Sequence, residues 1–182
     1  MQLPREIKSP RLRLRAPQWS DVGFLAELYG DPGVVRYLSF KPITRIELIQ
    51  TFLQKAIASW ERGKGSFDGS NSYLYVVEEQ KGKEVGTLGV RLETYGYELS
   101  YALLKSSWGR GYMPEAVGAV SEWLLSNGAW RVFATCHVDN VGSQRTLEKA
   151  GFEREGRLRR YFVFPNLGAE PADGYLYARV RE

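Results

Sequence analysis

Cysteine and histidine each occur only once among the 182 residues of this sequence. With Cys136 as the only thiol, an intramolecular disulfide and a cysteine-based metal cluster are excluded. The only histidine, His137, argues against a multi-histidine metal site. It also lies in an extended run, where we expect it to pack rather than to act in a serine–histidine triad. The sequence therefore predicts no metal site.

Long apolar runs are also missing. No stretch reaches the ~18 consecutive apolar residues of a membrane-spanning helix, and the N-terminus has no apolar segment like that of a signal peptide. The formal net charge is +4, and the basic residues are spread along the chain rather than clustered. We therefore expect a cytoplasmic protein that binds neither membranes nor nucleic acid directly, although the small positive excess suits an anionic cofactor or an acidic protein surface.

The length and composition of the sequence predict one folded domain over residues 1–182. An apolar fraction of 43% and an aromatic fraction of 13% argue against disorder. Apolar periodicity predicts helices at 21–29, 44–63, 114–127 and 140–150, and strands at 11–16, 73–79, 84–93, 97–104, 130–138, 152–155, 157–164 and 175–180. The polar, glycine-rich stretch 63–72 predicts a loop. Because Arg11, Arg13 and Arg15 alternate with leucines, we expect a solvated face on the first strand.

The stretch from Ser106 to Met113, Ser-Ser-Trp-Gly-Arg-Gly-Tyr-Met, joins a predicted strand to a predicted helix. Its two glycines let the backbone turn so that several N–H groups can point into one concavity at the helix start, which suits a pyrophosphate. The dinucleotide fingerprint is excluded because Pro114 stands where its third glycine would be, and a Walker A loop is excluded because no Lys-Ser or Lys-Thr follows. A tight turn without a ligand is the alternative.

Four short motifs occur in order along the second half of the chain: Trp-Gly-Arg-Gly-Tyr, Cys-His-Val-Asp-Asn, Glu-Lys-Ala-Gly-Phe and Tyr-Ala-Arg-Val. Together with the order of elements they resemble the GNAT superfamily of acyl-CoA-dependent N-acetyltransferases, and most of all its RimJ/RimL branch, which acetylates ribosomal-protein N-termini. The resemblance covers most of the chain. It implies a single α+β (α/β) domain with a mixed, mostly antiparallel sheet of about seven strands, a central parallel strand pair and flanking helices.

The resemblance also implies acetyl-CoA as the acyl donor, and it assigns residues to it. The strand end at Leu103 and Leu104 would pair with the pantetheine amides. Asn140 resembles the asparagine that bonds to the cofactor arm, and a plain helix cap is its alternative role. Ser143 resembles the residue near the sulfur. The pyrophosphate would be held by backbone N–H groups of Trp108, Gly109, Arg110, Gly111, Tyr112 and Met113.

One position of the loop departs from the family. Ser106 stands where Gln or Arg is often found. Because backbone groups carry the phosphate binding, this departure bears on affinity more than on membership.

Amide formation from a thioester needs a neutral amine and a proton for the departing thiolate. Glu98 is our first candidate for the base, with a water chain, or a plain solvent-facing glutamate, as alternatives. Some members of the branch carry a glutamate just past the position of Tyr161, where this chain has Phe162. For the acid the resemblance indicates Ser143, with Tyr161 in reserve. We expect Cys136 to be a small buried hydrophobe, which favours direct transfer in a ternary complex over an acyl-cysteine.

The predicted function is therefore transfer of an acetyl group from acetyl-CoA to a primary amine, with a protein N-terminus of the ribosomal type preferred. A small amine or an antibiotic is the alternative acceptor. A catalytically silent acyl-CoA-binding module is the alternative function. We expect a monomer or a homodimer.

Overall fold

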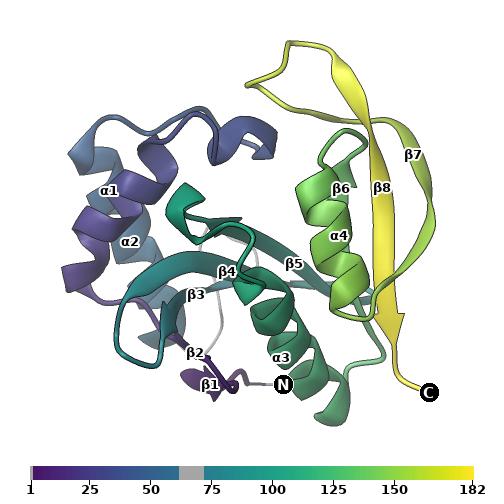
Figure 1. Ribbon diagram of the computed structural model, residues 1–182, viewed down its shortest axis with the longest axis horizontal. Coiled ribbons are helices and arrows are strands. Elements are labelled where there is room, and N and C mark those ends of the chain that lie inside the picture. The colour runs from purple at the N-terminus through teal and green to yellow at the C-terminus, as the bar shows by residue number, and fades with distance from the viewer. Residues whose placement is uncertain (1, 62–71) are drawn as a thin grey trace.

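The computed structural model describes residues 2–61 and 72–182, and its frame is one eight-stranded sheet (Figure 1). The strand order is β1-β2-β3-β4-β5-β6-β8-β7, and only the β5–β6 pair is parallel. The strands are β1 (Glu6–Lys8), β2 (Leu12–Arg15), β3 (Ser72–Glu79), β4 (Glu84–Glu93), β5 (Gly96–Leu103), β6 (Arg131–His137), β7 (Glu153–Val163) and β8 (Pro171–Val180).

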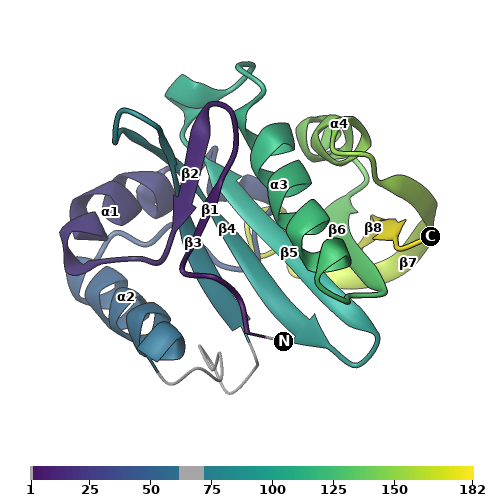
Figure 2. The same cartoon turned by 90° about the horizontal axis from the view of Figure 1, so that it is seen from below.

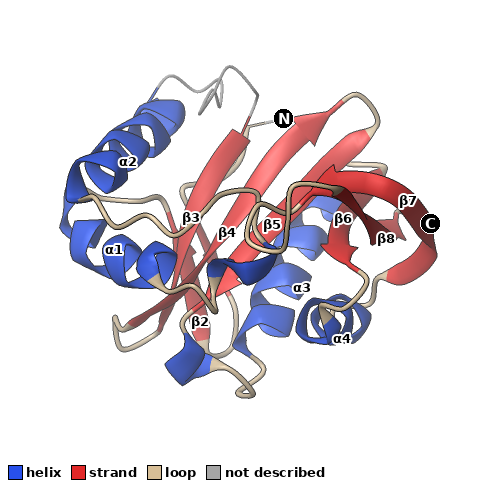
Figure 3. Cartoon of the chain, turned by 90° about the horizontal axis from the view of Figure 1, so that it is seen from above, coloured by secondary structure: helices blue, strands red, loops and turns tan. Residues whose placement is uncertain are grey.

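Two pairs of helices cover the two faces of this sheet. Helices α1 (Val22–Gly30) and α2 (Ile46–Glu61) lie on one face, and α3 (Tyr112–Ser126) and α4 (Val141–Lys149) lie on the other (Figures 2 and 3). Short 3-10 turns occur at Trp19–Asp21, Val35–Tyr37 and Lys105–Ser107. Among the described helices, none is long and apolar enough to cross a bilayer.

Strand β5 separates two apolar cores. Leu99 belongs to the core beneath α3, whereas Ala102 belongs to the core that α1 and α2 close. Successive side chains of a strand point to opposite faces, so this division follows from the sequence alternation. The same alternation sends Glu98 toward the face of α1 and α2 and Tyr101 toward the face of α3 and α4.

Strands β5 and β6 part after a short parallel contact. Their register joins only Tyr97 to Val132 and Glu98 to Phe133 within the described residues. Beyond that point β5 stays paired with β4 up to Leu103, and β6 stays paired with β8 up to His137. The facing edges of the two strands therefore diverge and leave a gap in the middle of the sheet.

The structure confirms the predicted order of helices and strands and the parallel pair. Helix α3 begins at Tyr112, two residues before the predicted start, and β1 was not predicted. The two strands predicted on either side of Gly156 form the single strand β7, because this glycine lies at a register shift against β8 rather than at a break. The loop predicted at 63–72 lies, except for Ser72, outside the described residues.

The predicted solvated face of the first strand is wrong for Arg15. Its guanidinium donates to the carboxylates of Asp21 and Glu78, both of which are buried. These ion pairs and hydrogen bonds raise the pKa of Arg15 despite the opposing effect of burial. Arg15 therefore compensates the charge of these two buried carboxylates, since an unpaired buried carboxylate destabilises the folded state.

Candidate active site

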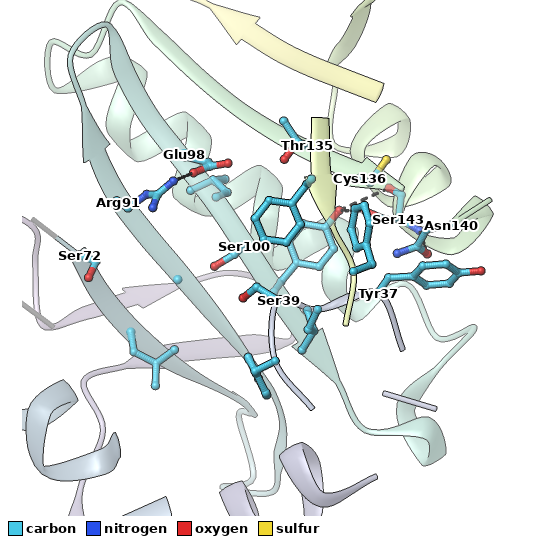
Figure 4. A pocket seen from close by; sticks show the side chains of 18 of the residues that line it. Tyr37, Ser39, Ser72, Arg91, Glu98, Ser100, Thr135, Cys136, Asn140 and Ser143 are labelled. Carbon is cyan, nitrogen blue, oxygen red and sulfur yellow. Dashed lines mark hydrogen bonds and ion pairs between the residues drawn. The ribbon is translucent and has the colours of Figure 1, made fainter. Parts of the chain in front are cut away.

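A cleft of about 650 Å³ lies where β5 and β6 part (Figure 4). Its lining includes Glu98 and Thr135, which point to the face of α1 and α2, and also Tyr101 and Cys136, which point to the opposite face. One cavity can contact both faces of a sheet only through a gap between strands. The cleft therefore connects the two sides of the molecule at the place where backbone groups of β5 and β6 lack a neighbouring strand.

The free backbone groups on β5 follow from its pairing with β4. The N–H of Leu104 donates to Val85 and its carbonyl accepts from Ser107, at 2.9 Å in both cases. In an antiparallel pair alternate residues direct both backbone groups to the same side. Leu103, Tyr101 and Leu99 therefore face the gap. An extended chain with amide groups can pair with Tyr101 and with the N–H of Leu103, whereas the carbonyl of Leu103 and both backbone groups of Leu104 are already engaged.

The indole of Trp108 closes the end of this strand. Its Nε1 donates to the carbonyl of Leu103 at 2.8 Å, and the ring itself is exposed. The prediction that the N–H of Trp108 binds the pyrophosphate is wrong, because this N–H donates to the carbonyl of Lys105 at 3.1 Å. The side chain of Trp108 fixes the turn between β5 and α3 instead.

The loop from Gly109 to Met113 has the geometry of an anion cradle. Gly109 and Gly111 have φ values of 76° and 75°, a left-handed conformation that strains any residue with a Cβ, and Gly111 is the N-cap of α3. None of the N–H groups from Gly109 to Met113 has an acceptor among the described residues. Pro114 follows without an N–H of its own. A pyrophosphate fits here because unpaired donors and the positive end of a helix dipole converge.

Asn140 and Ser143 begin α4 beside the cleft. The Asn140 side chain accepts from the N–H of Ser143 at 3.1 Å, so the helix-cap role is present. The Ser143 hydroxyl lies 2.8 Å from the Tyr101 hydroxyl. Burial raises the pKa of Tyr101 above its usual range, although its bond to Ser143 opposes this. The phenol therefore stays neutral and can donate to Ser143.

Cys136 lies next to this pair of hydroxyls and is buried. Burial raises the pKa of its thiol to about 11, and a hydrogen bond with Ser143 offsets part of that effect. A neutral thiol is a poor nucleophile. This environment fits the predicted packing role.

Glu98 lies on the other side of the cleft, paired with Arg91 (Figure 4). The register of β4 and β5 places the two residues opposite each other, and Arg91 also bonds to Glu93 at 2.7 Å. The side chain of Glu98 is 18% exposed. Its carboxylate is therefore accessible from the cleft and is held in place by a guanidinium.

Beside the cleft, two segments that are distant in the sequence are in contact. The Asn166 amide, in the turn between β7 and β8, donates to the carbonyls of Val35 and Phe40 at 2.8 and 2.7 Å. Nearby, the ring of Tyr37 stacks on His137, with centroids 5.2 Å apart. These contacts hold the segment between α1 and α2 against the β7–β8 hairpin (Figure 1).

Tyr161 lines the same cleft from β7, and its side chain is exposed. The cleft thus brings together all three residues predicted for catalysis: Glu98, Ser143 and Tyr161. Phe162 lies beside Tyr161 and lines the cleft as well, so an apolar ring takes the position where some members of the branch carry a glutamate. Among the described residues, no group of three or more histidine, cysteine, aspartate or glutamate side chains is placed to hold a metal ion.

Sequence reasoning missed the roles of Tyr101, Arg91 and Asn166. Tyr101 was visible only as one of several alternating apolar residues on its strand. Arg91 could have been found from hairpin register, since it lies opposite Glu98. Asn166 had no local signal, because its acceptors are 126 and 131 residues away.

The chain is similar to known acetyltransferases in sequence. The acetyltransferase (GNAT) domain family matches residues 11–153. The uncharacterised N-acetyltransferase p20 of Bacillus licheniformis is 26% identical over 159 residues, which cover 85% of this chain and 86% of that protein.

Two solved structures have a similar fold. RimL, a ribosomal L7/L12 alpha-N-protein acetyltransferase in complex with coenzyme A, gives a TM-score of 0.81 at 24% identity, covering 97% of this chain and 98% of its own. The microcin C7 self immunity acetyltransferase MccE, in complex with acetyl-CoA and AMP, gives 0.82 at 18% identity and covers 98% of each chain. At these identities the superpositions establish the fold.

Proposed function

Because the chain belongs to the acetyltransferase (GNAT) family and is an acyl-CoA-dependent N-acetyltransferase with acetyl-CoA as donor, we propose that its acceptor is the α-amino group of a protein N-terminus. The observation that carries this proposal is the cleft through the β5–β6 gap, whose lining reaches both faces of the sheet, so that donor and acceptor can approach one reaction point from opposite sides. The donor enters from the side of α3 and α4. The acceptor enters from the side of α1 and α2.

The residues of this chain suit acetyl-CoA. The N–H groups from Gly109 to Met113 would hold the pyrophosphate, and the backbone of β5 up to Leu103 would pair with pantetheine. Asn140 fixes the start of α4 beside that arm. When bound, acetyl-CoA supplies a thioester carbonyl that a neutral amine can attack.

Glu98 is proposed as the group that removes the proton of the acceptor amine, directly or through water. An α-amino group has a pKa of ~8 and is mostly protonated at neutral pH, so a base must act before attack. Glu98 is the last residue of β5 that pairs with β6, so it lies where the gap between these two strands begins. Its ion pair with Arg91 holds the carboxylate in place at the cleft.

Ser143 is proposed to deliver a proton to the departing thiolate. Its hydroxyl lies on the donor side of the gap, 2.8 Å from the hydroxyl of the neutral phenol of Tyr101, and this hydrogen bond orients it. Tyr161 is the alternative proton donor, because it also lines the cleft. It ranks second because its side chain is exposed to solvent. Direct transfer needs no acyl-enzyme, in keeping with the raised pKa of Cys136.

The rim of the cleft supports a chain terminus as acceptor. Asn166 holds the segment of the lining residue Phe40, and the stack on His137 holds the lining residue Tyr37, so the acceptor side of the cleft is fixed in place and an extended terminus is the acceptor that we expect it to take. RimL, which shares the fold, acts on the α-amine of ribosomal L7/L12. A ribosomal protein is thus our specific candidate, and a cytoplasmic location goes with it.

A small molecule is the second candidate acceptor. MccE, of the same fold, provides self-immunity to microcin C7, and aromatic residues such as Phe40, Phe52 and Tyr73 line much of the cleft of this chain. Apolar walls of this kind can also enclose a compact ligand.

The test is thiol release from acetyl-CoA with three acceptor sets. The first is a peptide with a free N-terminus and no lysine, the second is the same peptide with a blocked N-terminus and one lysine, and the third is a panel of small amines. We expect release with the first set and mass-spectrometric detection of the acetyl group on its α-amine. Release only with small amines would overturn the proposed acceptor, and no release with any set would favour the silent module.

A further inference from the structure

Arg11 contacts the proposed pyrophosphate loop from the far end of the sequence. Its Nη1 donates to the carbonyl of Arg110 at 3.0 Å and its Nη2 to the carbonyl of Gly111 at 3.2 Å. Its Nε donates to the Glu115 carboxylate in the first turn of α3 at 2.6 Å. In the described part of the chain, no other side chain donates to a carbonyl between Trp108 and Gly111.

These contacts determine where the loop donors point. A carbonyl and the N–H of the next residue belong to one planar trans peptide unit and point in opposite directions. Holding the carbonyl of Arg110 therefore turns the N–H of Gly111 away from Arg11, and holding the carbonyl of Gly111 does the same for the N–H of Tyr112. Both N–H groups belong to the set that lacks an acceptor in the described residues.

Arg11 is itself held in place from several sides. Glu115 also accepts from the backbone N–H of Arg11 at 2.8 Å and from the Ser9 hydroxyl at 2.7 Å. Burial would raise the pKa of Glu115, but these hydrogen bonds outweigh it and keep the pKa low. The guanidinium also lies 5.1 Å from the ring centroid of Tyr112. The fork of Arg11 is therefore preorganised behind the loop.

We propose that Arg11 is a positioning residue for the acyl donor: it fixes two peptide units of the loop so that their N–H groups face the pyrophosphate. The inference rests on the proposed assignment of this loop to acetyl-CoA. Arg11 lies on the carbonyl side of these peptide units and acts through them. Its effect therefore depends on the donor having a pyrophosphate.

The test compares donors with and without that group. For Arg11→Ala we expect CoA binding, measured by calorimetry, to weaken roughly 5- to 50-fold, because binding then has to order the loop. KM for acetyl-CoA should rise in parallel with kcat within about twofold of wild type, and kcat/KM for S-acetyl-pantetheine, which has no pyrophosphate, should stay within about twofold. Equal losses with both donors, or unchanged CoA binding, would overturn the inference.

Two further variants separate geometry from charge and from stability. Arg11→Lys keeps the charge and a partner for Glu115 but lacks the planar fork, so it should bind CoA nearly as weakly as Arg11→Ala. Full binding by Arg11→Lys would show that charge alone matters and would contradict the inference. Arg179→Ala is the matched control, because Arg179 pairs with Glu122 on the same helix α3 and does not contact the loop. It should bind CoA like wild type.

Calorimetry with CoA needs no acceptor and no turnover, so it separates this inference from the proposed reaction. A wild-type protein that binds CoA but transfers no acetyl group leaves the comparison of the Arg11 variants valid. A wild-type protein that binds no CoA overturns the loop assignment and this inference together.

Discussion

The hydroxyl oxygens of Tyr101, on β5, and Ser143, on α4, lie 2.8 Å apart. This bond joins a half-buried, neutral phenol to the serine proposed as proton donor. We expect Ser143→Ala to lower kcat by about 10²-fold, because it removes the donor, and Tyr101→Phe to lower it by about 10-fold, because Ser143 then loses orientation. In the double variant, Tyr101→Phe should add little to Ser143→Ala. Additive losses in steady-state kinetics would mean that the two hydroxyls act separately.

Glu98→Gln keeps the size of the side chain but removes its basicity. We expect kcat to fall by about 10²- to 10⁴-fold at neutral pH while the affinity for acetyl-CoA changes little. The variant should regain rate as pH rises toward the amine pKa of ~8, because solution chemistry then supplies the neutral amine.

The matched control for Glu98 is Glu93→Gln, since Glu93 is also a carboxylate bonded to Arg91 and does not line the cleft. It should leave the pH–rate profile unchanged. An equal loss for Glu98→Gln at every pH, or a change within about twofold, would assign Glu98 to positioning and leave proton removal to water or Tyr161.

The raised pKa of Cys136 predicts an unreactive thiol. Because burial moves this pKa from 9.0 to about 11, the folded protein should hold the thiol neutral at pH 7 to 9, where the unfolded chain already begins to ionise. Iodoacetamide should therefore alkylate the folded protein slowly until the pH approaches 11. For the urea-unfolded chain, the pH–rate profile of alkylation should have its midpoint near the ordinary thiol pKa of 9.0. Cys136→Ala should keep most of the turnover. Lost activity with retained CoA binding would instead support an acyl-cysteine.

Removing the Asn166 bridge should loosen the rim of the acceptor entrance. Asn166→Ala loses both hydrogen bonds to the carbonyls of Val35 and Phe40, so we expect KM for a peptide acceptor to rise about 5- to 10-fold while KM for acetyl-CoA stays within about twofold. Asn127→Ala is the control, since its amide donates to Trp123 at the end of α3, away from the cleft. A rise in both KM values would indicate general destabilisation instead.

The parts of this molecule that the sequence predicts are those with local causes. The turn at Gly109 and Gly111 and the cap at Asn140 depend on neighbours within a few residues, and both are present in the structure. The strand alternation that divides the two cores is also local. The resemblance added the family and the proposed place of the cofactor, neither of which composition and periodicity contain.

The parts that sequence reasoning missed depend on contacts between distant residues. Arg15 was predicted to be solvated because its buried partner Glu78 lies on another strand, 63 residues away. Arg11 was placed with Arg15 on that solvated face, and its contacts with the loop cross 99 and 100 residues. Gly156 suggested a break because the pairing partner that continues β7 through it is not visible locally.

Direct attack of the amine on acetyl-CoA, with both substrates bound at the gap between β5 and β6, is tested most directly by initial-rate kinetics in which both substrates are varied. Double-reciprocal lines should intersect, and the mass of the intact protein should not change when it is incubated with acetyl-CoA alone. Parallel lines together with an acetyl group on the enzyme would show a ping-pong reaction through an acyl-enzyme and would contradict the account.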